Sequence, residues 1–273
     1  MTEELNIFSL KNKVIVVTGA TGVLGEAFVN GLAAADATVV IIGRNEEVAQ
    51  ARVNEVIKSG GKAIYIIADV LNEEDLLKAN AKITNEFGKI DGLVNAAGGN
   101  VAEAVVQPGK DIFDLNIDAL KQAFDLNLFG TILPTQIFGK ELAKQGGSIV
   151  NISSVSASQA VTRVLGYSLA KSAIDSYTKW MAVELANRYG EKLRMNAIVP
   201  GFFITNQNRQ LLTNQDGTLT ARGEAIIYKT PFKRFGNPDE LIGALVYLLS
   251  DASKFVNGET LTVDGGFGAY SGV

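Results

Sequence analysis

Tyr167 and Lys171 place a phenol and an ammonium one turn apart on the same face of a helix. A phenol has a reference pKa of about 10 and exchanges protons poorly near neutral pH. A neighbouring cation stabilises the phenolate and lowers that pKa, so this pair could pass a proton to or from a substrate oxygen. The chain contains 0 His and 0 Cys, which excludes a histidine-based hydrolase, a cysteine nucleophile and thiolate metal sites. Acid–base chemistry therefore falls to Tyr, Lys, Asp or Glu.

Two polar residues upstream could complete a catalytic group with this pair. Ser154 follows a β-branched run at 148–152, and Asn127 lies in the preceding helical stretch. Taken singly, each could simply cap the end of a helix or strand. Their positions relative to Tyr167 and Lys171 favour a shared site.

A glycine-rich turn follows the first apolar run of the chain. It comprises Thr18-Gly-Ala-Thr-Gly-Val-Leu-Gly25 and leads into a helical pattern. Glycines at such a junction allow a tight turn and let backbone N–H groups meet a pyrophosphate. The alternative is an ordinary strand–helix turn, which the position after the first strand disfavours.

Arg44 follows Gly43 at the end of the second apolar run. In dinucleotide-binding folds this position carries an acid for a ribose 2′-hydroxyl or a base for a 2′-phosphate. Arg44 therefore favours NADP, with NAD as the alternative. A solvated arginine that merely opens a helix would look the same in sequence.

Short β-branched runs alternate with longer helical patterns, which predicts βαβ units and an α/β doubly wound, mainly parallel sheet of seven strands with helices on both faces. The interval 201–235 is polar and turn-rich, and we expect an irregular substrate lid there. Trp180 and the aromatic residues of 232–235 are expected to pack internally. The predicted strands are 14–17, 38–42, 63–68, 93–95, 148–152, 195–199 and 260–263, and the predicted helices are 23–35, 45–59, 73–87, a stretch ending near 144, 170–189 and 238–249.

Composition disfavours several classes of partner. The formal net charge is −4, and no run of Lys and Arg offers a surface for nucleic acid or an anionic membrane. The first residues are acidic where a signal peptide would be basic, and no apolar run approaches the ~20 residues that span a bilayer. We expect a cytoplasmic protein without a metal site.

With these motifs combined, the chain resembles the short-chain dehydrogenase/reductase family over nearly its whole length. The resemblance implies one NAD(P)-binding Rossmann domain over residues 1–273. The matching motifs are Thr18-Gly19, Asp69, Asn95-Ala-Ala-Gly98, Asn127, Ser154, Tyr167 with Lys171, Pro200-Gly201, Thr205 and Asp264-Gly-Gly266. The chain departs from the family pattern in two places. The family usually has the middle glycine of the turn at the position of Val23, whereas here it is Gly22, and Ala96 replaces a second Asn.

The resemblance also implies a role for each residue of the tetrad. Tyr167 exchanges a proton with the substrate oxygen, and Lys171 lowers the pKa of Tyr167 and binds the nicotinamide ribose. Ser154 holds the carbonyl oxygen, and Asn127 anchors a water that connects Lys171 to solvent. The cofactor-binding residues expected by the same resemblance are Thr18, Gly19, Thr21, Gly22, Val23, Leu24, Gly25, Arg44, Asn45, Asp69, Val70, Asn95, Ala96, Ala97, Gly98, Tyr167, Lys171, Pro200, Gly201, Phe203 and Thr205.

Within this family the segment 200–209 and the tail 265–272 resemble the D-mannonate oxidoreductase (fructuronate reductase) branch. A sugar acid needs a cation for its carboxylate and amides or hydroxyls for its diols. The expected substrate residues are Asn100, Ser154, Arg163, Asn206 and Arg209.

Other interpretations remain open. The substrate could be 5-ketogluconate or a 3-oxoacyl thioester, and a non-catalytic dinucleotide-binding regulator belongs to another class, although such a regulator would not need both Tyr167 and Lys171. The family resemblance further implies a homotetramer, and the sparsely charged region around Ala173, Ile174 and Tyr177 suggests where helices of different copies meet.

Overall fold

Seven strands form a single parallel sheet in the part of the chain that the structure describes. A computed structural model describes residues 7–205 and 208–272, and the strand order in it is β3-β2-β1-β4-β5-β6-β7. The predicted doubly wound α/β fold is confirmed. The strands are β1 (Val14–Thr18), β2 (Thr38–Gly43), β3 (Lys62–Ile67), β4 (Gly92–Asn95), β5 (Gly147–Ile152), β6 (Leu193–Pro200) and β7 (Thr260–Val263).

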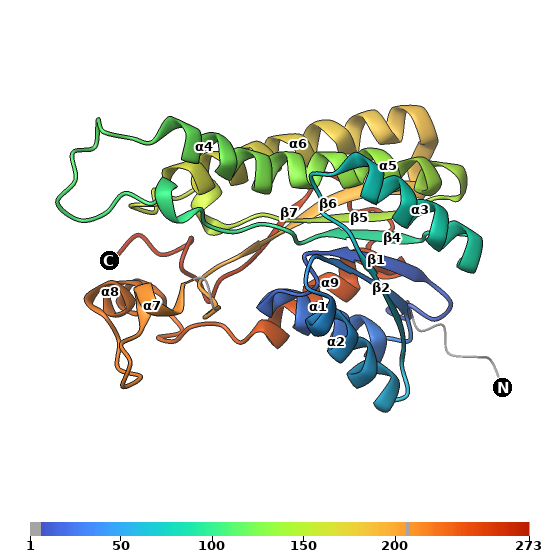
Figure 1. The fold of residues 1–273 in the computed structure, drawn as a ribbon, viewed down its shortest axis with the longest axis horizontal. Helices are drawn as coiled ribbons and strands as arrows, with labels where there is room; N and C mark the ends of the chain where they lie inside the picture. The colour runs from blue at the N-terminus through green and yellow to red at the C-terminus, as the bar shows by residue number, and fades with distance from the viewer. Residues whose placement is uncertain (1–6, 206–207, 273) are drawn as a thin grey trace.

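Helices cover both faces of this sheet (Figure 1). One layer contains α1, α2 and α9, the other contains α3, α4, α5 and α6, and α7 and α8 lie together at one end. The helices are α1 (Val23–Ala34), α2 (Glu46–Lys58), α3 (Glu73–Phe87), α4 (Ile117–Phe124), α5 (Gly130–Gln145), α6 (Leu165–Tyr189), α7 (Arg209–Leu212), α8 (Ala221–Lys229) and α9 (Ile242–Leu249). A π-helical turn, Asp125–Phe129, joins α4 to α5.

The alternation of side chains along β1 explains the two layers. Ile15 and Val17 belong to the apolar cluster under α1, α2 and α9, whereas Val14 and Val16 belong to the cluster under α3, α5 and α6. Successive strand residues point to opposite faces, so a strand that is apolar at every position is buried on both. This is why these strands are nearly continuous apolar runs.

Strand order reverses between β1 and β4, since β1 pairs with β2 on one side and with β4 on the other. In open α/β sheets, ligands bind in the crevice beyond the carboxyl ends of the strands at this switch point. The glycine turn after β1, the segment after β4 and Ser154 after β5 all lie at this edge. The topology thus gathers the predicted motifs.

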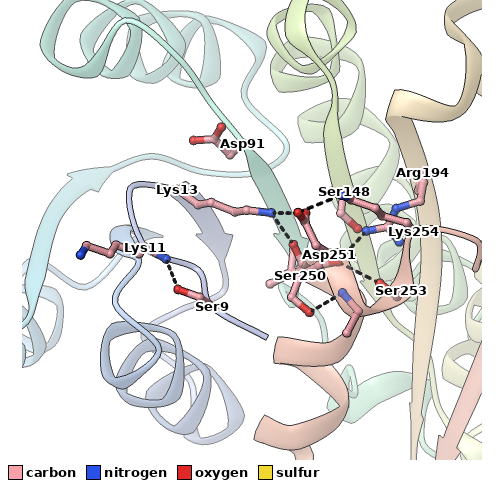
Figure 2. Close-up of polar contacts among 12 residues, drawn as sticks. Ser9, Lys11, Lys13, Asp91, Ser148, Arg194, Ser250, Asp251, Ser253 and Lys254 are labelled. Carbon is pink, nitrogen blue, oxygen red and sulfur yellow. Dashed lines mark hydrogen bonds and ion pairs between the residues drawn. The ribbon is translucent and has the colours of Figure 1, made fainter. Parts of the chain in front are cut away.

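The opposite edge of the sheet is held by a polar network (Figure 2). Lys13, just before β1, forms an ion pair of 3.4 Å with Asp251. Near the starts of β5 and β6, the hydroxyl of Ser148 donates to the carbonyl of Leu248 at 2.7 Å, and Arg194 Nη2 donates to the same carbonyl at 3.1 Å. These bonds tie three strands to the end of α9, so the amino edge serves stability and leaves the carboxyl edge for a site.

Two predicted boundaries are wrong. Helix α6 begins at Leu165, whereas the sequence predicted a start at Ala170. The earlier start has no signal in the sequence, because the N-cap residue, Val164, makes no side-chain capping bond. The interval 201–235 was expected to be irregular but contains α7 and α8. The Thr220 side chain accepts a hydrogen bond from the backbone N–H of Gly223 and so caps α8.

The aromatic prediction is also wrong for two residues. Trp180 is 62% exposed and Phe232 is 67% exposed in the chain. Neither side chain is buried in the interior of this chain. No helix within the described residues is both long and apolar enough to span a membrane.

Candidate active site

A cavity of about 520 Å³ lies at the carboxyl edge of the sheet. It extends from the glycine turn after β1, past the ends of β4 and β5, to the segment containing α7 and α8. Its volume falls in the range of small-molecule and cofactor sites, roughly 300–1,000 Å³. Within the described ranges, no group of three or more acidic side chains is arranged to hold a metal ion.

The glycine turn is shaped by close contacts that no side chain could fit. Gly19 has φ +64°, and a Cβ there would lie 2.5 Å from the backbone nitrogen of Ala97. A Cβ on Gly25 would lie 2.5 Å from the carbonyl oxygen of Gly19. Gly22 occupies the N-cap of α1 without a side-chain capping bond. The N-terminus of α1 therefore faces the cavity with open backbone donors, which suits a pyrophosphate.

Thr18 and Asn95 support the cavity from behind. Thr18 Oγ1 accepts from the backbone nitrogens of Ala96 and Ala97 at 3.2 and 3.4 Å. Asn95 is buried, and its Nδ2 donates to Thr135 and Asn151 at 2.9 Å each. Thr18 thus fixes the segment after β4, whose backbone lines the cavity, and Asn95 ties the end of β4 to α5 and β5.

Two arginines lie at the end of the cavity near β2. Arg44 Nη1 lies 3.6 Å from Asp69 Oδ2 in an exposed ion pair. Arg52, on α2, is buried and paired with Glu26 at 3.1 Å. Burial lowers the pKa of Arg52, and Glu26 opposes that shift. Sequence reasoning missed Arg52, because its position on α2 resembles that of any helical surface arginine.

Tyr167 and Lys171 both face the cavity from the first turns of α6. Lys171 Nζ donates to the carbonyl oxygen of Ile152 at 2.7 Å and lies 5.5 Å from the centroid of the Tyr167 ring. Lys171 is only 4% exposed, and burial lowers the pKa of its ammonium to about 8, although Asp175 favours the charged form. The ammonium is thus held beside the phenol, as the helical spacing predicts.

The pKa of Tyr167 is shifted in the direction opposite to the predicted one. Burial raises this pKa, and the hydrogen bond with Ser154 only opposes the rise. Burial dominates because the phenolate would be removed from water. Ser154 Oγ accepts from the backbone nitrogen and hydroxyl of Ser156 at 3.2 and 3.1 Å, which fixes its position at the end of β5.

Asn127, in the π-helical turn, is buried and bonded to backbone. Its Nδ2 donates to the carbonyls of Gly99 and Ala123 at 2.8 Å each, and its Oδ1 accepts from the nitrogen of Gly99 at 2.9 Å. A Cβ on Gly98 would lie 2.7 Å from Asn127 Oδ1 and 3.3 Å from Lys171 Nζ. Asn127 therefore holds the 98–99 backbone directly beside Lys171.

The cavity brings together most of the predicted site residues but not all. Asn45 does not line the cavity, and its side chain caps α2 by accepting a hydrogen bond from the backbone nitrogen of Val48. The other predicted residues that are absent from the cavity wall are Thr18, Asn95, Asn127, Arg163 and Arg209. Asn206 lies outside the described residues. Those that line the cavity are Gly19, Thr21, Gly22, Val23, Leu24, Gly25, Arg44, Asp69, Val70, Ala96, Ala97, Gly98, Asn100, Ser154, Tyr167, Lys171, Pro200, Gly201, Phe203 and Thr205.

Arg222 lines the cavity from α8 and was not predicted. Its Nη1 and Nη2 donate to the hydroxyl and carbonyl of Thr162 at 3.0 Å each. Sequence reasoning missed it because the start of α8 was expected to be irregular. An arginine at a helix start within a suspected lid is the signal that could have found it.

Comparison with known proteins places the chain among oxidoreductases. The sequence model of a family described as enoyl-(acyl carrier protein) reductase matches residues 19–268. The uncharacterised oxidoreductase UxuB of Bacillus subtilis is 44% identical, over 97% of this chain and 98% of that protein.

Two solved structures cover nearly all of both chains. A proposed D-mannonate oxidoreductase from Haemophilus influenzae with bound NAD has a TM-score of 0.89 at 41% identity, covering 97% of this chain and 98% of the other. A gluconate 5-dehydrogenase from Burkholderia cenocepacia in complex with NADP and tartrate has a TM-score of 0.85 at 32% identity, covering 98% and 99%.

Proposed function

Because the chain belongs to the short-chain dehydrogenase/reductase family of NAD(P)-dependent oxidoreductases, we propose that it interconverts a keto sugar acid and its alcohol, with D-fructuronate and D-mannonate as the substrate pair. The observation that carries this proposal is the wall of the cavity around Tyr167. Asn100, Asn208 and Arg222 contribute amides and a guanidinium to that wall. A polyhydroxylated carboxylate would use these polar groups, whereas an acyl chain would use only the apolar side chains that also line the cavity, such as Val155 and Leu211.

The cavity fits a dinucleotide at its glycine-rich end. Gly19, Gly22 and Gly25 leave room for a phosphate group beside the N-terminus of α1, and Cβ atoms at Gly19 or Gly25 would collide with backbone. When bound, the nicotinamide supplies the hydride that reduces the carbonyl carbon. The protein supplies position and the proton.

The proposal gives each tetrad residue a role with which its contacts agree. Tyr167 donates its phenolic proton to the substrate oxygen during reduction and takes it back during oxidation. The Ser154 hydroxyl, fixed by Ser156, donates to the same oxygen as negative charge develops on it. Lys171 favours the phenolate by its charge when Tyr167 has lost its proton, and Asn127 positions the backbone beside Lys171.

NADP is the preferred cofactor in this proposal, and NAD is the alternative. Arg44 is exposed at the cavity wall, and its only ion pair within the described residues is the 3.6 Å contact with Asp69. A 2′-phosphate carries more charge than a carboxylate and would displace Asp69 from this arginine. Arg52 adds a second guanidinium nearby, although Glu26 neutralises it.

The proposed assembly is a homotetramer. One face of α6 carries Leu169, Ala173, Trp180 and Val183, at spacings of 4, 7 and 3 residues, and Trp180 and Val183 are 62% and 59% exposed. Such a stripe suits pairing with a helix of another copy. Ile174, which the sequence suggested for this role, is fully buried within its own chain and cannot take part.

A kinetic panel tests the substrate. The wild-type enzyme is assayed by nicotinamide absorbance with D-fructuronate, tagaturonate, 5-ketogluconate and acetoacetyl thioester. The highest kcat/KM is expected for D-fructuronate. Highest activity on the thioester would overturn the sugar-acid assignment and leave the oxidoreductase assignment intact.

A further inference from the structure

Six charged side chains line the cavity, and four of them form two ion pairs. Arg44 lies beside Asp69 and Arg52 beside Glu26. Lys171 is held by the Ile152 carbonyl next to Tyr167, and burial lowers its pKa. The sixth is Arg222, which forms no ion pair within residues 7–205 and 208–272.

A second guanidinium is close enough to Arg222 to repel it. Burial and the charge of Arg163 both lower the pKa of Arg222. Two cations near each other, without a carboxylate between them in the described part of the chain, leave positive potential at this end of the cavity. An anion bound there would relieve it.

The side chain of Arg163 is hydrogen-bonded within the protein. Its Nε donates to the carbonyl of Val106 at 3.0 Å and its Nη2 to Gln107 Oε1 at 2.8 Å, while the Val106 nitrogen donates to the Arg163 carbonyl at 2.8 Å. Arg163 also has a φ of +76°, a backbone conformation that its neighbours must hold in place. It fastens the segment before α6 to the segment after β4 and does not line the cavity.

Arg222 retains donors for a ligand. Its two bonds to Thr162 fix the plane of the guanidinium and use two of its five N–H groups. Three N–H groups remain, enough for a carboxylate bound through both oxygens. Arg209, the other predicted candidate, is exposed and outside the cavity wall.

We propose that Arg222 is the residue that binds the substrate carboxylate and makes the enzyme selective for acids, and that Arg163 is a positioning residue that holds the Thr162 segment against Arg222. This proposal rests on the proposed function, because it takes the sugar acid as substrate. It assigns the charge selectivity to α8, while Tyr167 and Lys171 on α6 and Ser154 after β5 serve the proton transfer.

The test compares a charged substrate with its neutral counterpart. D-Fructuronate and D-fructose differ by a carboxylate in place of a hydroxymethyl group, so their kcat/KM ratio reports the contact with that carboxylate. Arg222→Ala and Arg222→Gln are expected to lower the ratio by at least about 10-fold, with fructose kinetics nearly unchanged. Arg222→Lys should retain part of the preference. Thermal unfolding of each variant establishes that it is folded.

Two controls separate charge binding from general damage. Arg209→Ala removes an exposed arginine on the adjacent helix and should leave the ratio unchanged. Arg163→Ala should lower kcat/KM for both substrates alike, because it loosens the Thr162 segment. If the wild-type enzyme reduces fructuronate and Arg222→Ala keeps the same kcat/KM ratio, the proposal is overturned. The proposed function would then still stand.

A binding measurement covers the case in which no sugar acid is turned over, which would refute the proposed function. Tartrate, a hydroxylated dicarboxylate, is titrated calorimetrically into the complex of enzyme and NADPH. Weaker binding to Arg222→Ala than to wild type or Arg209→Ala would still support a carboxylate site at Arg222. Equal binding to all three, or no binding to wild type, would refute it.

Discussion

The Lys171 ammonium lies 5.5 Å from the centre of the Tyr167 ring, and burial shifts the pKa values of the two groups in opposite directions, away from each other. Burial lowers the pKa of Lys171 to about 8 and raises that of Tyr167. In both cases the neutral form is favoured. The site therefore keeps the phenolic proton available for donation to a substrate oxygen at neutral pH, which suits carbonyl reduction.

Replacing Tyr167 with Phe should abolish most turnover while the protein still folds and binds cofactor. The substitution removes the proton donor but keeps the ring, and acid–base catalysis contributes about 100- to 10,000-fold. The measurements are kcat with fructuronate and the quenching of protein fluorescence by NADPH. Retention of more than about a tenth of wild-type kcat would remove Tyr167 from its proposed role.

Lys171 should make the stability of the protein depend on pH in an alkaline window. Its folded-state pKa of about 8 lies below the reference value of 10.5, so the unfolded chain binds more protons than the folded one between these values. The free-energy cost of burying the Lys171 ammonium is fully present below pH 8 and is relieved as the amine loses its proton. The stability of the fold therefore increases with pH between about 8 and 10.5. Tyr167, with its raised pKa, acts against stability only above its unfolded value of about 10.

Melting temperatures of wild type and Lys171→Met, recorded from pH 7 to pH 10, test this dependence. The difference, wild type minus variant, should rise with pH above 8. Parallel curves over the whole range would show that the ammonium of Lys171 is not perturbed. The variant should also raise the KM for cofactor, because Lys171 is proposed to bind the nicotinamide ribose.

The fold could be predicted because its signals are local and repeated. Each strand of the sheet buries both faces, so residues such as Val14–Thr18 must be apolar at nearly every position. Strand–helix alternation then restricts the topology to a parallel sheet. The start of α6 was missed because Val164 offers no cap, and α8 was missed because its only local signal, the Thr220 cap, lies in a polar stretch.

The proximity of Tyr167 and Lys171 could be predicted from the sequence, whereas that of the residues in the proposed carboxylate site could not. Tyr167 and Lys171 lie on one helix, so their spacing defines their geometry. Arg163 and Arg222 are brought together only by tertiary structure, through the bonds of Arg222 to Thr162. Side chains that meet across loops leave no periodic pattern in the sequence. Reasoning from sequence therefore selects an arginine that is close to the tetrad along the chain, such as Arg163.

Arg44→Asp should shift cofactor preference from NADP towards NAD. The substituted carboxylate would lie near Asp69, and both would repel a 2′-phosphate. The expected change in the ratio of kcat/KM values, NADP over NAD, is at least about 10-fold. Lys58→Asp, which makes the same change of charge at the other end of α2, serves as the control. A wild-type enzyme that already prefers NAD by tenfold would contradict the assignment.

Asn127→Ala should destabilise the fold and reduce turnover together. The substitution leaves the buried N–H and C=O of Gly99 without their partners, at a cost of about 1–3 kcal/mol for each group. It also frees the 98–99 backbone beside Lys171. Urea unfolding measures the first effect and kcat the second. Asn116→Ala removes the cap of α4, so it should cost about 1 kcal/mol without changing kcat.

Trp180→Glu should lower the mass of the particle in solution. In the proposed homotetramer the exposed stripe of α6 packs against a partner copy, and a buried carboxylate there would be unpaired. Light scattering of wild type should give about four times the 29.0 kDa of one chain, and the variant a smaller multiple. Ile57→Glu places the same charge on α2, in the other helix layer, where Ile57 is 57% exposed, and should leave the mass unchanged. If both variants retain the wild-type mass, α6 is not the contact, and a wild-type mass of 29.0 kDa would remove the oligomer altogether.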